Sequence, residues 1–159
     1  MPRPRKTIVA VESKDPRDPI EWEATLPIRP SSPAWRATIR AFYGKVPLTE
    51  EEVEIFREIA GDIDPPVGGK SELLVVAGRR GGKSEEIARL AVFEALFGNH
   101  AIALAPGQLG LIAIISPLRE QSVELARYCK GLCALDQVKP YLDGEPIATE
   151  IRFSTGVAI

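Results

Sequence analysis

The chain has 159 residues, 45% apolar and 26% charged, with a formal net charge of −2. This composition is typical of a single globular domain with a substantial core. The small negative charge gives no reason to expect bulk electrostatic attraction to nucleic acid or to an anionic membrane. The sequence contains neither an apolar run of transmembrane length nor a signal peptide, so we expect an intracellular protein.

Residues 1–30 are rich in proline and charge and lack a sustained periodicity. This pattern predicts an extended arm. Ile20 and Trp22 are large apolar residues within the arm, and we expect them to anchor it to the rest of the chain.

Residues 31–64 predict a small helical N-terminal subdomain. Its first helix has Ser32 as N-cap and Pro33 at the first helical position. Its second helix begins with the capping box Thr49–Glu52. The aromatic residues of this subdomain are interpreted as core residues, with a contribution to an adenine pocket as the alternative. They are Trp35, Phe42, Tyr43 and Phe56.

The stretch from Leu73 to Ser84 carries the strongest functional pattern in the chain. Leu73–Ala77 is a short apolar run that predicts a buried strand, and residues 85–97 predict a helix. The loop between them contains three glycines and ends Gly-Lys-Ser. Strand, glycine loop and helix form the context of a phosphate-binding P-loop, because backbone N–H groups can surround a phosphate at the positive end of a helix dipole. The motif departs from the usual pattern at Ala77, where its first glycine is expected.

The P-loop pattern assigns a role to each polar residue of the loop. Lys83 would contact the β- and γ-phosphates of ATP, and the Ser84 hydroxyl would bind Mg²⁺. The residues predicted to bind the nucleotide phosphates are Gly78, Gly81, Gly82, Lys83, Ser84 and Glu85. A second Gly-Gly-Lys-Ser, residues 68–71, is followed by no helix and is interpreted as a surface turn.

The remainder of the chain alternates predicted strands and helices. The apolar run Leu109–Ile115 predicts a second buried strand, residues 118–132 predict a helix, and residues 150–159 predict a strand that bends at Gly156 into another. This order predicts an α/β fold: a P-loop NTPase core with a largely parallel sheet, preceded by the helical N-terminal segment. Residues 65–159 contain no apolar strand that ends in aspartate (Walker B) and no carboxylate placed to orient water. We therefore interpret them as a partial ATPase core, truncated before Walker B, with little hydrolysis by itself.

Three segments of the chain resemble phage terminase large subunits, the ATPases that package DNA into proheads. Residues 77–84 resemble their Walker A loop, which commonly carries arginine before the Gly-Lys-Ser. Residues 112–121 resemble the strand-Pro-x-x-x-Gln segment that follows, and Ile151–Gly156 resembles their I-x-F-x-x-G hairpin. The order and spacing of the segments agree with the family over roughly residues 65 to 159.

The resemblance implies the ATP-binding part of a viral DNA-packaging motor that uses ATP and Mg²⁺. It implies that Arg79 or Arg80 acts with Lys83 in catalysis and stabilises the transferring phosphate, as an arginine finger does. It also implies double-stranded DNA, a portal protein and a small terminase subunit as partners, an oligomeric full-length protein, and the host cell cytoplasm as its location. The alternatives are another P-loop ATPase, helicase-like or of AAA type, and a stand-alone nucleotide-binding protein.

Overall fold

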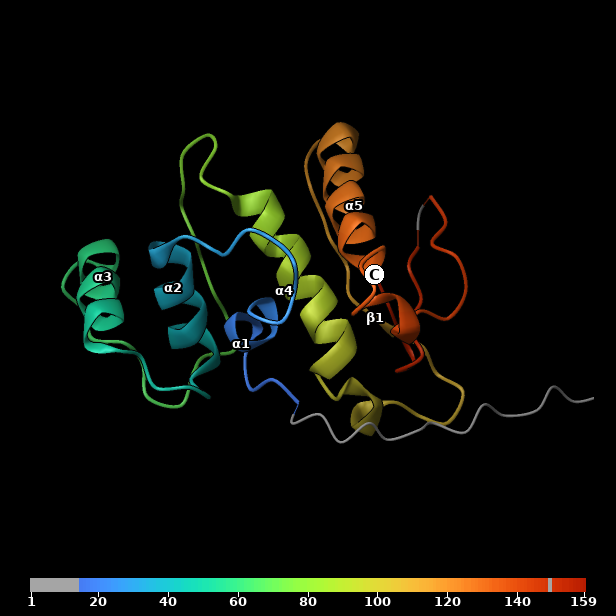
Figure 1. Ribbon diagram of the computed structural model, residues 1–159, viewed down its shortest axis with the longest axis horizontal. Helices are drawn as coiled ribbons and strands as arrows, with labels where there is room; N and C mark the ends of the chain where they lie inside the picture. The colour runs from blue at the N-terminus through green and yellow to red at the C-terminus, as the bar shows by residue number, and fades with distance from the viewer. Residues whose placement is uncertain (1–14, 149) are drawn as a thin grey trace, which may run out of the picture.

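The computed structural model describes residues 15–148 and 150–159, and helices dominate these residues. Figure 1 shows α2 and α3 packed together at one end of the molecule, α4 across its middle and α5 beside α4. In chain order the elements are α1 (Pro19–Glu23), α2 (Pro33–Tyr43), α3 (Glu50–Ala60), α4 (Lys83–Phe97), the 3₁₀ turn η1 (His100–Ala103), β1 (Gly110–Leu111), α5 (Arg119–Cys133), the 3₁₀ turn η2 (Lys139–Tyr141) and β2 (Val157–Ala158).

The two helices predicted in the N-terminal subdomain are confirmed, with their caps. The Ser32 side chain accepts a hydrogen bond from the Trp35 N–H, and α2 ends at Gly44 in the left-handed region at φ 61°. At α3 the capping box is complete. The Glu52 N–H donates to Thr49 Oγ1 at 3.2 Å, and the Thr49 N–H donates to Glu52 Oε2 at 3.0 Å. Such bonds reach only three residues along the chain, which is why the sequence predicted them well.

The predicted arm contains a short helix, α1, that the composition did not indicate. Asp18 caps it by accepting hydrogen bonds from the N–H groups of Ile20 and Glu21 at 3.0 and 2.9 Å. Ile20 and Trp22 are both buried, so the predicted anchoring is confirmed. The expectation of a wholly extended arm is wrong for residues 19–23, and its first part, residues 1–14, lies outside the described residues.

The predicted α/β class, a P-loop NTPase core with a largely parallel sheet, is wrong for the described chain. The sheet consists of β1 and β2 alone in these residues, paired in parallel with Gly110 opposite Val157. Leu73–Ala77 is not a strand: no backbone hydrogen bond among the described residues joins it to another extended segment. Its side chains Leu74 and Val76 are 91% and 93% exposed. A strand needs a partner for its N–H and C=O groups, and apolar residue type alone does not supply one.

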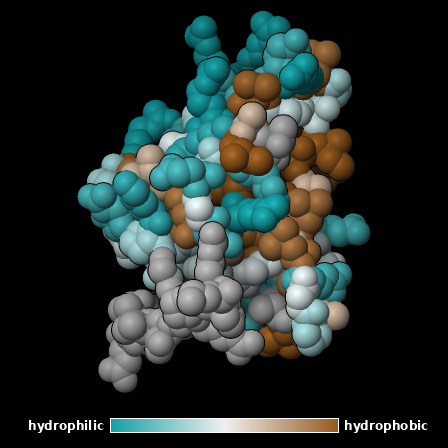
Figure 2. Space-filling view, turned by 90° about the vertical axis from the view of Figure 1, so that its right-hand side faces the viewer, coloured by the Kyte–Doolittle hydropathy of each residue, from teal (hydrophilic) through white to brown (hydrophobic). Residues whose placement is uncertain are grey.

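The second apolar run behaves in a similar way. Of Leu109–Ile115, only β1 is a strand, with the Ile112 N–H extending the pairing to Ala158 O at 2.8 Å. Ile112 and Ile114 pack against the core, whereas Leu111 and Ile115 are exposed. Figure 2, which looks at the right-hand side of Figure 1, shows apolar side chains at the surface on this face.

The predicted bend near the end of the chain is confirmed. Gly156 has φ 82°, and the Phe153 N–H donates to Val157 O at 2.9 Å across the bend. Ile151 and Ile159 exchange two backbone hydrogen bonds of 2.9 Å, so the two segments pair as a short hairpin.

The core lies where α4 meets α5, α1 and this hairpin. α4 is buried on more than one side, because it contacts α1, α5 and β2. None of the helices in the described part of the chain is long and apolar enough to cross a membrane. The main buried residues of the core are Trp22, Leu26, Ala88, Val92, Phe93, Leu96, Cys129, Leu132, Cys133, Val138, Ile151, Phe153 and Val157.

Candidate functional site

The predicted glycine loop runs directly into the first turn of α4. The chain turns at Arg79 and Arg80, and α4 begins at Lys83, two residues before the predicted start. Arg80 has φ 62° and Gly82 has φ 77°. The left-handed conformation is unusual for a residue with a side chain, and such strained positions are concentrated at functional sites. The loop and helix of the predicted P-loop are therefore present, although the strand before them is not.

The ammonium group of Lys83 lies inside this loop. Its Nζ donates to the carbonyl oxygens of Ala77 and Gly78 at 2.6 and 2.7 Å. The Gly81 N–H donates back to Gly78 O at 3.3 Å, which closes the loop around the lysine. An ammonium held by two carbonyl dipoles can exchange them for the oxygens of an anion, with which it forms stronger charge-assisted bonds.

The first turn of α4 presents backbone N–H groups beside the lysine. The first backward bond of the helix runs from the Glu86 N–H to Gly82 O at 3.0 Å. The N–H groups of Lys83, Ser84 and Glu85 therefore have no partner within the helix. Gly82 has no side chain to cap them, and no other cap is seen among the described residues. The Ser84 side chain is exposed at the same end of the helix.

The two arginines predicted to act in catalysis are both exposed in the turn. Arg79 and Arg80 differ in backbone conformation, since only Arg80 has a positive φ. Within the described residues, no group of three or more His, Cys, Asp or Glu side chains gathers that could hold a metal ion. Mg²⁺ in nucleotide sites takes most of its ligands from phosphate and water, so the predicted role of Ser84 needs no such group.

Trp35 of α2 reaches the loop from 46 residues away. Its Nε1 donates to the carbonyl oxygen of Gly81 at 2.6 Å. The sequence interpretation placed this tryptophan in a core or an adenine pocket and missed the contact. No signal along the chain could have indicated it, because the hydrogen bond joins separate elements.

Arg89 of α4, next to the loop, binds the glutamate side chains around it. It is 4% exposed, and its guanidinium donates to Glu23 at 2.7 Å, to Glu85 at 2.5 Å and to Glu86 at 3.2 Å. A further bond reaches Arg29 O at 2.8 Å. The group ties the segment after α1 to the first two turns of α4. Because Arg89 also binds the side chains of Glu85 and Glu86, these carboxylates stabilise the folded structure beside the loop.

The Ser31 hydroxyl lies between two of these carboxylates. Its Oγ is 2.5 Å from Glu23 Oε2 and 2.8 Å from Glu86 Oε2, and it accepts a bond from Arg89 at 2.7 Å. A hydroxyl has one hydrogen to donate, so it cannot make a full hydrogen bond to both carboxylates at once. Burial raises the pKa of Glu86 above its ordinary value, against the lowering effects of the Ser31 bond and the Arg89 charge.

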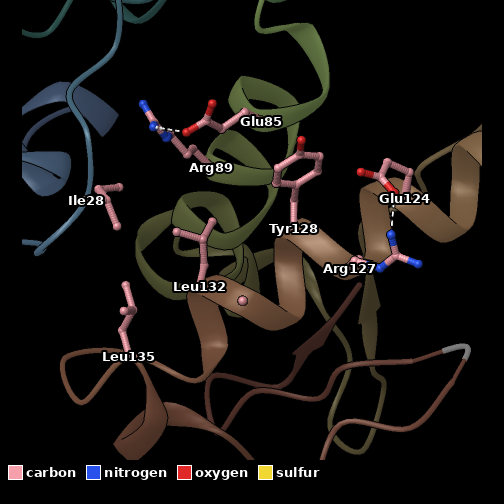
Figure 3. Close-up of a pocket in the computed structure, with 9 residues that line it drawn as sticks. Ile28, Glu85, Arg89, Glu124, Arg127, Tyr128, Leu132 and Leu135 are labelled. Atoms are coloured by element: carbon pink, nitrogen blue, oxygen red, sulfur yellow. Dashed lines mark hydrogen bonds and ion pairs between the residues drawn. The ribbon is translucent and has the colours of Figure 1, made fainter.

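A cavity of about 270 Å³ opens between α4 and α5, beside this cluster. Figure 3 shows Glu85 and Arg89 on one side, Tyr128 and Leu132 on the other, and Ile28 toward the N-terminal segment. Among the described residues that line the cavity, Glu85 alone belongs to the predicted phosphate site. The cavity and the loop are thus neighbours and not one site.

The second Gly-Gly-Lys-Ser, residues 68–71, is a turn without a following helix, as predicted. The Lys70 N–H donates to Phe42 O at 2.8 Å. A Cβ added to Gly69 would lie 2.5 Å from Tyr43 O, so position 69 needs a glycine to pack closely against the end of α2. The Gly-Gly-Lys-Ser of residues 68–71 therefore has a packing role.

Comparisons with family models, with curated proteins and with solved structures match nothing to this chain. The assignment of a function accordingly depends on the residues of the loop and their geometry.

Proposed function

We propose that residues 77–85 bind the phosphates of ATP·Mg²⁺, and that the chain is the ATP-binding part of a DNA-packaging motor of the terminase type. The observation that carries the first part is the position of Lys83. Its ammonium is bound by Ala77 O and Gly78 O at the N-terminal end of a 15-residue helix. Positive charge, N–H groups without a partner in the helix and the helix dipole converge at this point, which favours a polyphosphate.

Each loop residue has a role in this proposal. Lys83 exchanges its two carbonyl partners for β- and γ-phosphate oxygens, and the N–H groups of the first turn bind the same phosphates. Ser84, exposed at the end of α4, binds Mg²⁺. Arg79 and Arg80 are exposed in the turn, where either guanidinium could reach a phosphate held by the loop. Because Arg89 engages Glu85 and Glu86, we expect the chain to bind ATP but to hydrolyse it slowly.

The first test compares the two Gly-Gly-Lys-Ser segments. Lys83→Ala should weaken binding of ATP·Mg²⁺ and of inorganic tripolyphosphate about 10- to 100-fold, because hydrogen bonds from a charged group are lost. Lys70→Ala removes the same side chain from the same tetrapeptide without the helix, and should leave both affinities unchanged. Titration calorimetry measures both. Equal affinities for the wild type and Lys83→Ala would refute the site.

The motor assignment is supported by the resemblance of residues 77–84, 112–121 and 151–156 to terminase segments. It places the protein in the cytoplasm of the host cell, in an oligomer with double-stranded DNA, a portal protein and a small terminase subunit as partners.

A second test addresses the motor assignment through the coding DNA beyond codon 159. We expect an apolar strand ending in Asp-Glu and then an acidic, nuclease-like region, either in frame or after a single frameshift. A stop codon with no such sequence nearby would count against a packaging motor, while leaving the phosphate site to be judged by the Lys83 experiment.

A further inference from the structure

The orientation of the peptide group between Gly81 and Gly82 is set by a residue outside the loop. The carbonyl oxygen of Gly81 accepts a hydrogen bond from Trp35 Nε1 at 2.6 Å. A trans peptide is planar, and its C=O and N–H groups point in opposite directions. The bond to Trp35 therefore turns the Gly82 N–H away from α2.

Gly82 itself is shaped by this contact. A Cβ added there would lie 3.3 Å from Trp35 Nε1, and φ 77° is a conformation that glycine adopts without strain. Gly82 is also the N-cap of α4, so its N–H directly precedes those of Lys83 and Ser84. Without the bond to Trp35, the glycine on each side would let this peptide rotate and direct a carbonyl oxygen at the phosphate position.

We propose that Trp35 is a positioning residue for phosphate binding: by holding the Gly81 carbonyl on α2, it directs the Gly82 N–H toward the bound phosphate. The inference rests on the proposed function of the loop and adds to it a residue from a separate element. It assigns the indole N–H of Trp35 to the loop that would bind the polyphosphate.

The test removes the indole N–H with Trp35→Phe and measures affinity for inorganic tripolyphosphate and for ATP·Mg²⁺. Loss of one hydrogen bond that orders the site should weaken both about two- to tenfold, by the same factor. The matched control is Trp22→Phe, since the Trp22 ring packs on Phe93 and Phe97 of α4 and should leave both affinities unchanged. A loss for ATP alone would indicate base stacking and overturn the proposal, as would no loss for either ligand.

An NMR measurement on the wild-type chain does not depend on the folding of a variant. The Gly82 amide resonance should shift when tripolyphosphate is added, together with those of Lys83 and Ser84. Shifts at Lys83 and Ser84 with an unmoved Gly82 amide would overturn the role of Trp35 while supporting the site. If neither the wild type nor Lys83→Ala binds tripolyphosphate, the proposed function itself fails and this inference fails with it.

Discussion

Replacing Arg89 by methionine should destabilise the protein by about 3–5 kcal/mol, the usual effect of removing one partner from a buried ionic group. The guanidinium is 4% exposed and compensates the carboxylates of Glu23, Glu85 and Glu86. Without it, buried acidic groups remain with no cation, and the segment after α1 loses its attachment to α4. Urea unfolding followed by circular dichroism measures the change.

The control for this substitution is Arg127→Met in α5. Arg127 also pairs with a glutamate, Glu124 at 2.8 Å, but its side chain is 73% exposed. An exposed pair of this kind contributes at most about 1 kcal/mol. Adding Glu23→Gln and Glu86→Gln to Arg89→Met should restore part of the lost stability, since the uncompensated charges are then gone. A loss below about 1 kcal/mol for Arg89→Met alone would contradict the structural role of the cluster.

Phe93→Ala should destabilise the protein by a similar amount, about 3–5 kcal/mol, because it leaves a cavity at the centre of the core. Phe93 is 2% exposed, and its ring centroid lies 6.0 Å from Trp22, 5.6 Å from Tyr43 and 5.3 Å from Phe97. It thus joins α1, α2 and α4. The same unfolding experiment measures the loss, and the emission of Trp22 should shift to the red as water reaches its ring.

The comparison for Phe93→Ala is Phe93→Leu, which keeps most of the buried volume. It should cost less than about 1.5 kcal/mol. If the two variants were equally stable, the aromatic cluster would not be the centre of the core. Since a small domain has only about 5–15 kcal/mol of stability, Phe93→Ala and Arg89→Met together are expected to unfold the chain.

These two groups also explain how the N-terminal residues affect the loop. α1 and α2 reach α4 through Trp22, Glu23 and Tyr43, and α2 reaches the loop itself through Trp35. The segment before residue 64 therefore packs on α4, and Trp35 is the residue of α2 that contacts the candidate site. The division of the sequence into an arm, a helical subdomain and a core did not anticipate this dependence.

The sequence by itself determined α2, α3, α4, α5 and the glycine loop. Ser32, Thr49 and Gly44 act through bonds to residues three or four positions away, so a local pattern is enough to predict them.

Only the tertiary structure decided the sheet and the surroundings of the loop. The apolar runs from Leu73 and from Leu109 have the residue types of buried strands, yet a strand exists only where a second segment supplies hydrogen bonds, and most of their length has no described partner. The bond from Trp35 to Gly81 and the bond from Arg89 to Glu23 join residues 46 and 66 positions apart. Such contacts depend on how the helices pack, because no spacing along the chain encodes them.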